Sequence, residues 1–153
     1  MTKTLADLSE KMRGIDFCML NTHGLEGAIT ARPMSNNREV GPQGDTIFFT
    51  CENALMVGDI ARNPHVSLTF QGKAGMFGAR PFFVAIDGHA ELIREKEQFA
   101  AHWTSGLDRW FEQGIDTPGL VLIKVHAERL HYWDGYHEGE IELGGARQPE
   151  AVR

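Results

Sequence analysis

The chain has 153 residues, of which 42% are hydrophobic and 24% are charged, and this size and composition suit one globular domain with its own core. Its 15 basic residues against 21 acidic residues give a formal net charge of −6 at pH 7. This balance argues against a dedicated nucleic-acid binder, whose affinity comes mostly from basic side chains that neutralise phosphates. No segment approaches the roughly 20 apolar residues of a membrane-spanning helix, and no secretory signal opens the chain. We therefore expect a single cytoplasmic domain over residues 1–153.

Cysteine and glycine usage give two further expectations. Cys18 and Cys51 lie in separate apolar runs without a Cys-x-x-Cys pair, which favours buried free thiols over a disulfide framework or a zinc site. The 17 glycines exceed the average usage of about 7%. Several of them separate short apolar runs, as the turns of a sheet protein do.

Short helices are predicted at several places along the chain. Thr4 and Asp7 have the spacing of a capping box ahead of apolar residues at helical intervals, and Gly14 can serve as the C-cap. Asn53 is a plausible N-cap for the next helix, which Asn63-Pro64 should end because proline disfavours helix in the residue before it. The predicted helical segments are 4–13, 53–61, 95–103 and a shorter piece at 107–111.

Strands are predicted between these helices. Residues 65–70 alternate apolar and polar side chains, the pattern of a strand with one buried face. Gly88 interrupts a longer run and indicates a bulge or a barrel bend. The last two strands should form a closing hairpin, and residues 135–153 should form a polar tail behind a core of about 5–134. The predicted strands are 15–22, 28–34, 46–51, 65–70, 81–92, 120–125 and 130–133, with glycine-rich turns at 23–27 and 72–78.

The order of these elements predicts a fold class. Consecutive strands joined by tight turns pair antiparallel, and a small antiparallel sheet with glycine bends often closes into a barrel, which removes its edges. The alternation of strands and helices is too irregular for a parallel, doubly wound sheet. We expect a mainly β protein with short helices, built on an antiparallel barrel of six to seven strands.

Most catalytic signatures are missing from the sequence. There is no Gly-x-Gly-x-x-Gly after a strand, no phosphate-binding Gly-x4-Gly-Lys-Ser/Thr loop and no Gly-x-Ser-x-Gly turn. Three histidines gather near two glutamates, but their spacing is not that of a metal site, and we expect no metal. These residues are His126, His131, His137, Glu138 and Glu140.

Two features could hold an anion. Arg32, near the end of an apolar run, offers a bidentate fork for a phosphate or a carboxylate. The strand that ends in Phe49-Thr50 leads into the helix that begins near Asn53, and a helix N-terminus attracts anions through its N–H groups and its dipole. The alternatives are that Arg32 is a solvated strand residue and that Asn53 only caps the helix.

The tryptophans are candidates for packing or for covering a ligand ring. Trp103 and Trp110 are seven residues apart and would share one face of a continuous helix, which favours a core or interface role. Trp133 lies where a strand ends, and an amphipathic ring at such a position can cover a planar heterocycle.

Taken in order, these segments resemble a known family: the FMN-binding split barrels related to pyridoxamine 5′-phosphate oxidase, specifically the general stress protein 26 group. The resemblance covers about residues 5–134 and supports an antiparallel split β-barrel. The segments that carry it are Ala31-Arg32-Pro33-Met34, Ile47-Phe48-Phe49-Thr50, the run from Ile60 to Leu68, the run from Ile86 to Glu91, Trp103 with the run from Trp110 to Gly114, and Tyr132-Trp133-Asp134.

The resemblance implies a homodimer that binds FMN in a groove between its subunits, with FAD or another flavin as the alternative. The strand residues flank the phosphate and ring of the flavin, the start of the following helix completes the phosphate end, and a tryptophan approaches the ring, from the same subunit or its partner. No catalytic residue is assigned. The cofactor-binding residues so implied are Arg32, Pro33, Met34, Phe49, Thr50, Ala54, Leu55, Met56, Trp110 and Trp133.

Two departures from the resembled family bear on function. Met56 stands where relatives commonly carry a lysine, which removes a cation from the phosphate end. The basic substrate-binding residues of true pyridoxamine 5′-phosphate oxidases are not recognisable. The resemblance therefore implies a low-specificity oxidoreductase or flavin reductase of the general stress protein type; the alternatives are a flavin carrier or sensor without turnover and a dimeric barrel that has lost its cofactor.

Overall fold

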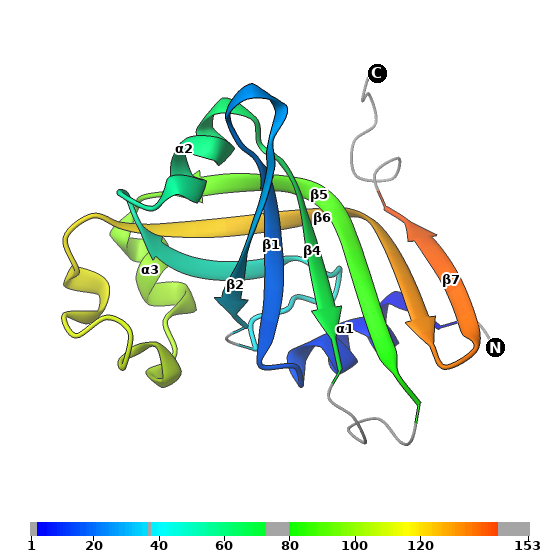
Figure 1. The fold of residues 1–153 in the computed structure, drawn as a ribbon. Coiled ribbons are helices and arrows are strands. Elements are labelled where there is room, and N and C mark those ends of the chain that lie inside the picture. Colours follow the sequence, from blue (N-terminus) through cyan, green and yellow to red (C-terminus); the bar gives the residue numbers. More distant parts are fainter. Residues whose placement is uncertain (1–2, 37, 73–79, 144–153) are drawn as a thin grey trace.

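A computed structural model describes residues 3–36, 38–72 and 80–143. In it, one antiparallel sheet curls into a half-barrel and carries three short helices (Figure 1). The strand order is β2-β1-β4-β5-β6-β3, with β7 also pairing with β6. The strands are β1 Phe17–His23, β2 Ile29–Ser35, β3 Thr46–Cys51, β4 His65–Gln71, β5 Phe82–Ile93, β6 Leu120–Asp134 and β7 His137–Glu142. The helices are α1 Leu5–Arg13, α2 Leu55–Arg62 and α3 Lys96–His102, with 3-10 turns η1 Leu25–Gly27, η2 Ser105–Leu107 and η3 Gly114–Asp116. The predicted fold class is confirmed.

Helix α1 forms as its sequence predicts. The Thr4 hydroxyl accepts a hydrogen bond from the backbone N–H of Asp7, and the Asp7 carboxylate accepts one from the N–H of Thr4, so the capping box is complete. Gly14 is the C-cap. Leu8 and Met12 are fully buried in the main core inside the curled sheet, and α1 lies across one end of the half-barrel (Figure 1).

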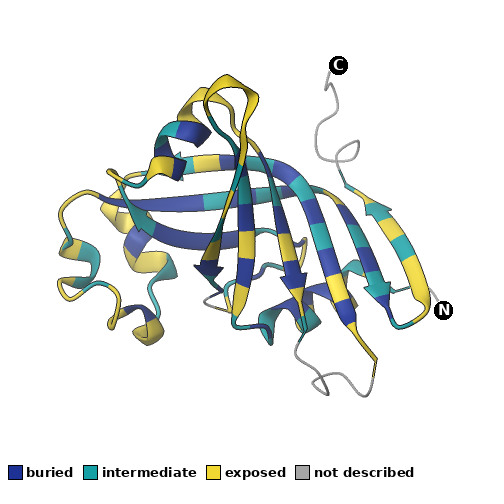
Figure 2. Ribbon diagram, viewed as in Figure 1, coloured by how far each residue is buried: buried dark blue, intermediate teal, exposed yellow. Residues whose placement is uncertain are grey.

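Alternating side chains give the sheet a buried inner face and an outer face. In β4, Val66, Leu68 and Phe70 are buried while their neighbours are more exposed, as the alternation predicts. The same striping is visible along β1 and β5 in Figure 2. The predicted hairpin of β1 and β2 is confirmed, with Phe17 paired to Ser35 and His23 to Ile29.

Gly88 lies at a β-bulge, as predicted, opposite the extra residue Glu128 of β6. The register between β5 and β6 shifts between Asp87 and Gly88. A Cβ atom at Gly88 would lie 2.1 Å from the carbonyl oxygen of His126, so only glycine lets the two backbones come this close. The bulge bends the two longest strands of the sheet and contributes to its curl.

The predicted closing hairpin at 120–125 and 130–133 is wrong. Both segments belong to one strand, β6, because the polar residues between them stay paired with β5: Ala127 is fully buried between the less buried His126 and Glu128, and the bulge shifts the alternation by one residue at Glu128 and Arg129. The hairpin partner is β7, reached through Gly135 at φ 66°. This strand lies within the stretch predicted as a polar tail, and its largely exposed residues give little apolar signal.

Two helix predictions also need correction. Asn53 does not cap α2; Ala54 is the N-cap and makes no side-chain capping bond. Trp103 and Trp110 do not share a helix, because α3 ends before Trp103 and the chain continues through η2 and turns. Asn63-Pro64 ends α2 at Arg62 as predicted. The predicted turn at 72–78 lies outside the described residues apart from Gly72. Among the helices in the described ranges, none is long and apolar enough to span a membrane.

Asp134 ties the N-terminal segment to the end of β6. Its carboxylate is buried and lies 2.9 Å from the ammonium of Lys3 and 3.5 Å from that of Lys11. The hydrogen bond from Lys3, together with both positive charges, lowers the pKa of Asp134 below its ordinary value, and the same hydrogen bond raises the pKa of Lys3.

Replacing Asp134 by asparagine should therefore destabilise the protein in a pH-dependent way. Because the pKa of this carboxyl is lower in the folded chain than in the unfolded chain, its ion pairs stabilise fully above about pH 4 and are lost as the pH falls through the folded value. We expect the free energy of unfolding of Asp134→Asn to be roughly 1 kcal/mol below the parent at pH 7, and the difference to shrink steadily as the pH falls below about 4. Urea unfolding across this range measures it; a deficit that does not change with pH would contradict the ion-pair account.

Gly88→Ala should cost about 2–3 kcal/mol of unfolding free energy, because the added methyl group clashes with backbone rather than with a flexible side chain. Gly106→Ala is a matched control, since its new Cβ would have no neighbour closer than 3.9 Å, and should change stability by less than about 0.5 kcal/mol. Thermal or urea unfolding compares the two. Similar losses at both positions would show that the bulge does not require glycine.

Candidate functional site

A cavity of about 480 Å³ lies where β2 and β3, the strands at the two ends of the pairing order, come near each other. The start of α2 and the chain around η2 complete its walls. Its lining is mostly apolar and aromatic, as ligand sites commonly are. The lining residues are Phe17, Pro33, Met34, Ser35, Phe49, Thr50, Cys51, Asn53, Ala54, Met56, Leu107, Trp110 and Phe111.

One wall of this cavity is aromatic because side chains along β3 alternate between its two faces. Phe48 is buried in the main core, so Phe49 faces the other side of the strand, into a smaller core beneath α3. There the Phe49 ring makes edge-to-face contacts with Phe99 at 5.9 Å and with Trp103 at 5.0 Å between ring centroids. Trp103 in turn contacts Phe111 at 5.8 Å. This packing fixes the Phe49 ring, so one cavity wall is rigid.

Seven of the ten residues predicted to bind the cofactor line this one cavity: Pro33, Met34, Phe49, Thr50, Ala54, Met56 and Trp110. Trp110 is 53% exposed and forms part of the rim. Sequence reasoning missed Phe17, Ser35, Cys51, Leu107 and Phe111 as lining residues, and it considered Asn53 as part of an anion-binding helix end or as a cap only. Three of these adjoin predicted residues, whereas Phe17 and Leu107 come from segments that carried no motif.

Arg32 is not among the lining residues, although it shares a face of β2 with Met34. Its guanidinium donates to the hydroxyls of Thr22 at 2.8 Å and Thr30 at 3.0 Å, and it lies 3.6 Å from the buried carboxylate of Asp59 on α2. The hydroxyl of Thr22 also donates to Asp59, at 2.8 Å. The guanidinium is thus engaged within the protein, and its expected phosphate contact stays a prediction.

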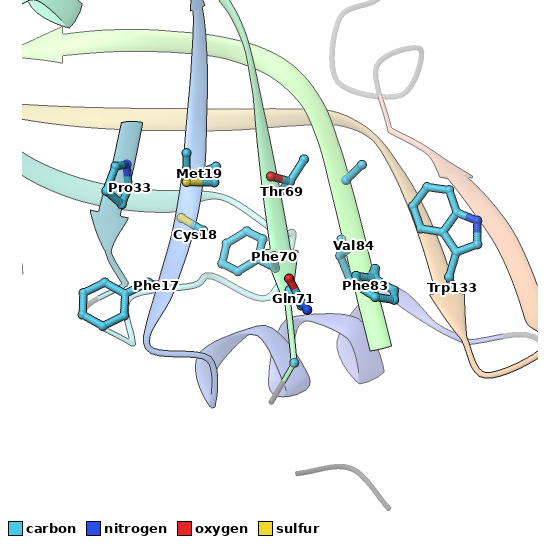
Figure 3. A pocket seen from close by; sticks show the side chains of 12 residues that line it. Phe17, Cys18, Met19, Pro33, Thr69, Phe70, Gln71, Phe83, Val84 and Trp133 are labelled. Carbon is cyan, nitrogen blue, oxygen red and sulfur yellow. The ribbon is translucent and has the colours of Figure 1, made fainter. Parts of the chain in front are cut away.

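Leu55 and Trp133 also lie away from this cavity. Leu55 is 85% exposed. Trp133 lies on the outer face of the sheet, beside a second hollow of about 630 Å³ that crosses β1, β4 and β5 (Figure 3), and its ring stacks on His131 at 4.2 Å. Phe17 and Pro33 line both hollows, so the outer face and the first cavity are continuous.

The lining of the cavity suits a flat, largely apolar ring better than it suits a phosphate. Its aromatic and thioether walls match a flat, largely apolar heterocycle. At the α2 end, the lining offers the Thr50 hydroxyl, the Asn53 amide and the first N–H groups of a helix. Among the residues that the structure describes, none that lines this cavity is a lysine, arginine or histidine.

Ionisable groups in this region are few. Cys51 lines the cavity and is partly exposed, whereas Cys18 is buried, and burial raises the pKa of the Cys18 thiol to about 12. Both thiols are free. Within the described ranges, no three histidine, cysteine or acidic side chains are placed to hold a metal ion; His126 and His131 form separate pairs with Glu91 and Glu138.

Comparisons with known proteins agree with this architecture. The chain is 26% identical over 113 residues to general stress protein 26 of Bacillus subtilis (strain 168), covering 73% of this chain and 79% of that protein. A Clostridium acetobutylicum protein related to general stress protein 26 superposes with a TM-score of 0.75 at 18% identity, covering 91% of this chain and 94% of the other. General stress protein 26 of Bacillus anthracis str. Sterne gives 0.68 at 20% identity, covering 89% and 98%.

A heme-binding protein from Mycobacterium smegmatis has a similar fold, with a TM-score of 0.71 at 18% identity; the match covers 93% of this chain and 59% of that protein. The model of the family described as "Pyridoxamine 5′-phosphate oxidase like" matches residues 3–144. The resemblance seen in the sequence is confirmed, and the chain belongs to the pyridoxamine 5′-phosphate oxidase-like family.

Proposed function

We propose that this protein binds a flavin, with FMN the expected form, and holds its ring in the cavity between β2, β3 and α2. The observation that carries the proposal is that seven residues chosen from the sequence for flavin binding line one aromatic cavity. Family membership supports the same ligand class. A bound flavin would supply the electron chemistry, as flavin cofactors do.

The side chains of this chain would position the ring rather than transfer protons. Phe49 is held by its aromatic neighbours, Trp110 can cover one face of a planar ligand, and the Thr50 hydroxyl can hydrogen-bond to it. Apart from Cys51, no lining residue among those described is ionisable. This favours a low-specificity oxidoreductase or flavin reductase, in which the ring itself exchanges electrons, over a reaction that needs an acid or base from the protein.

Anaerobic mixing of the FMN-loaded protein with NADH or NADPH separates turnover from carriage. Bleaching of the flavin absorption faster than for free FMN supports the reductase. A bound flavin that the nicotinamide does not bleach supports a carrier or sensor. A protein that takes up no flavin contradicts both functions.

The outer sheet face supports the further proposal that the protein is a homodimer. Phe17, Met19 and Phe83 are 53%, 39% and 37% exposed and lie on one face, with Trp133 at its side (Figure 3). Large apolar side chains gathered on a surface mark contact sites. Because Phe17 and Pro33 also line the ring cavity, a second copy of the chain seated on this face would also shield the ring from water.

Trp110→Ala should weaken flavin binding without unfolding the protein, because this half-exposed ring borders the cavity and lies outside both cores. The expected loss is about 1–2 kcal/mol, a roughly 5- to 30-fold higher Kd, measured by quenching of flavin fluorescence. Tyr136→Ala removes an aromatic ring that is 97% exposed and outside the cavity, and should leave the Kd unchanged. Equal effects of the two substitutions would contradict the assigned site.

Met19→Asp should convert a dimer into a monomer, because a carboxylate placed in an apolar interface loses its hydration without gaining a partner. Analytical ultracentrifugation measures the mass of both proteins. Tyr136→Asp adds the same charge away from this face and should remain dimeric. A parent protein that sediments as a monomer, or a Met19→Asp variant that stays dimeric, would contradict the proposed interface.

A further inference from the structure

Resting on the proposed flavin site, we propose that the cavity holds its ligand by the ring and gains little affinity from a phosphate, so that riboflavin binds about as tightly as FMN. The ligand class is then flavins in general, with or without a phosphate on the ribityl chain, and FMN is one member of this class. Three observations around the α2 end of the cavity carry this inference.

The first observation is the chemistry of the lining. Its polar side chains are those of Ser35, Thr50 and Asn53, which are neutral. At the start of α2, the cavity meets the methyl group of Ala54 and the thioether of Met56. A phosphate monoester carries nearly two negative charges, and proteins that bind one tightly usually meet it with arginine or lysine. The described residues of this lining can offer a phosphate hydrogen bonds but no compensating charge.

The second observation is that Asp59 already engages the arginines on the elements beside the cavity. Asp59 is buried on α2, and its Oδ1 accepts from Arg62 at 2.7 Å. Its Oδ2 accepts from Thr22 and Thr30 and lies 3.6 Å from Arg32. To bind a phosphate, the Arg32 guanidinium would have to leave the hydroxyls of Thr22 and Thr30 and the carboxylate of Asp59. The Asp59 carboxylate would then stay buried without this positive charge, which is costly.

The third observation concerns two other arginines, Arg94 and Arg109, and the helix dipole. Arg94, beside the end of β3, is paired with Glu52 through two hydrogen bonds. Arg109 lies over the exposed Trp110 ring, 5.2 Å from its centroid, where water and salt screen its charge. The positive end of the α2 helix dipole supplies only about half an elementary charge. The net charge of the whole chain, −6, does not add to it.

Titration with riboflavin and with FMN tests the inference directly. We expect the two dissociation constants to agree within about threefold and to change little between low and high salt, because no ion pair forms. FMN that binds more than threefold tighter, with an affinity that falls as salt is added, would overturn the inference while leaving the flavin site intact. Binding of neither flavin would overturn the proposed function itself.

A lysine placed on the lining should create the missing charge. Asn53 is exposed and lines the cavity, so Asn53→Lys should fold and should tighten FMN binding about tenfold relative to riboflavin binding. Leu55→Lys is the matched control, because Leu55 lies two residues away, 85% exposed and off the cavity; it should alter the ratio of the two constants less. Met56→Lys places the same charge at a buried lining position and should likewise tighten FMN binding relative to riboflavin binding.

Arg32→Ala tests the role of the engaged arginine. We expect lower thermal stability, because Asp59 loses a neighbour, and an unchanged ratio of the FMN and riboflavin constants. Loss of FMN affinity with riboflavin binding unaffected would show that Arg32 reaches the phosphate and would overturn the inference. So would an Asn53→Lys variant that binds the two flavins as the parent does.

Discussion

The site depends on one constraint, the incomplete closure of the curled sheet. The two strands at the ends of the pairing order, β2 and β3, are edges of the sheet, yet both line the same cavity. A closed barrel would pair these edges with each other, whereas here α2 and the chain around η2 cover the seam between them. The bulge at Gly88 bends β5 against β6 and contributes to the curl that brings the edges near.

The same geometry divides the interior into two cores with different tasks. The main core, which includes Phe48 and the buried side of α1, stabilises the half-barrel. The smaller core, which includes Phe49 and Phe99, supports the wall of the cavity. Phe48 and Phe49 are adjacent in β3, so this one strand contributes to both cores. The cavity is thus built on strands of the sheet, while helix α2 beside it is held by the hydrogen bonds of Asp59.

Much of this could be predicted from the sequence because the signals are local. The Thr4–Asp7 capping box, the alternation over 65–70 and the glycine at position 88 each reflect one element or one close approach. The continuous strand β6 and its partner β7 could not, since polar residues on an outer face resemble a turn or a tail. The direction of the Arg32 side chain was also hidden, because it is decided by Asp59, which lies 27 positions further along the chain.

The central claim is that flavin occupies the cavity beside β3, and alkylation of Cys51 tests it most directly. The chain has two cysteines; Cys51 is partly exposed on the cavity, whereas Cys18 is buried with its pKa raised to about 12. Mass spectrometry after brief iodoacetamide treatment should find the label on Cys51 alone, and saturating riboflavin should slow its labelling. Labelling of Cys51 at the same rate with and without bound flavin would contradict the account.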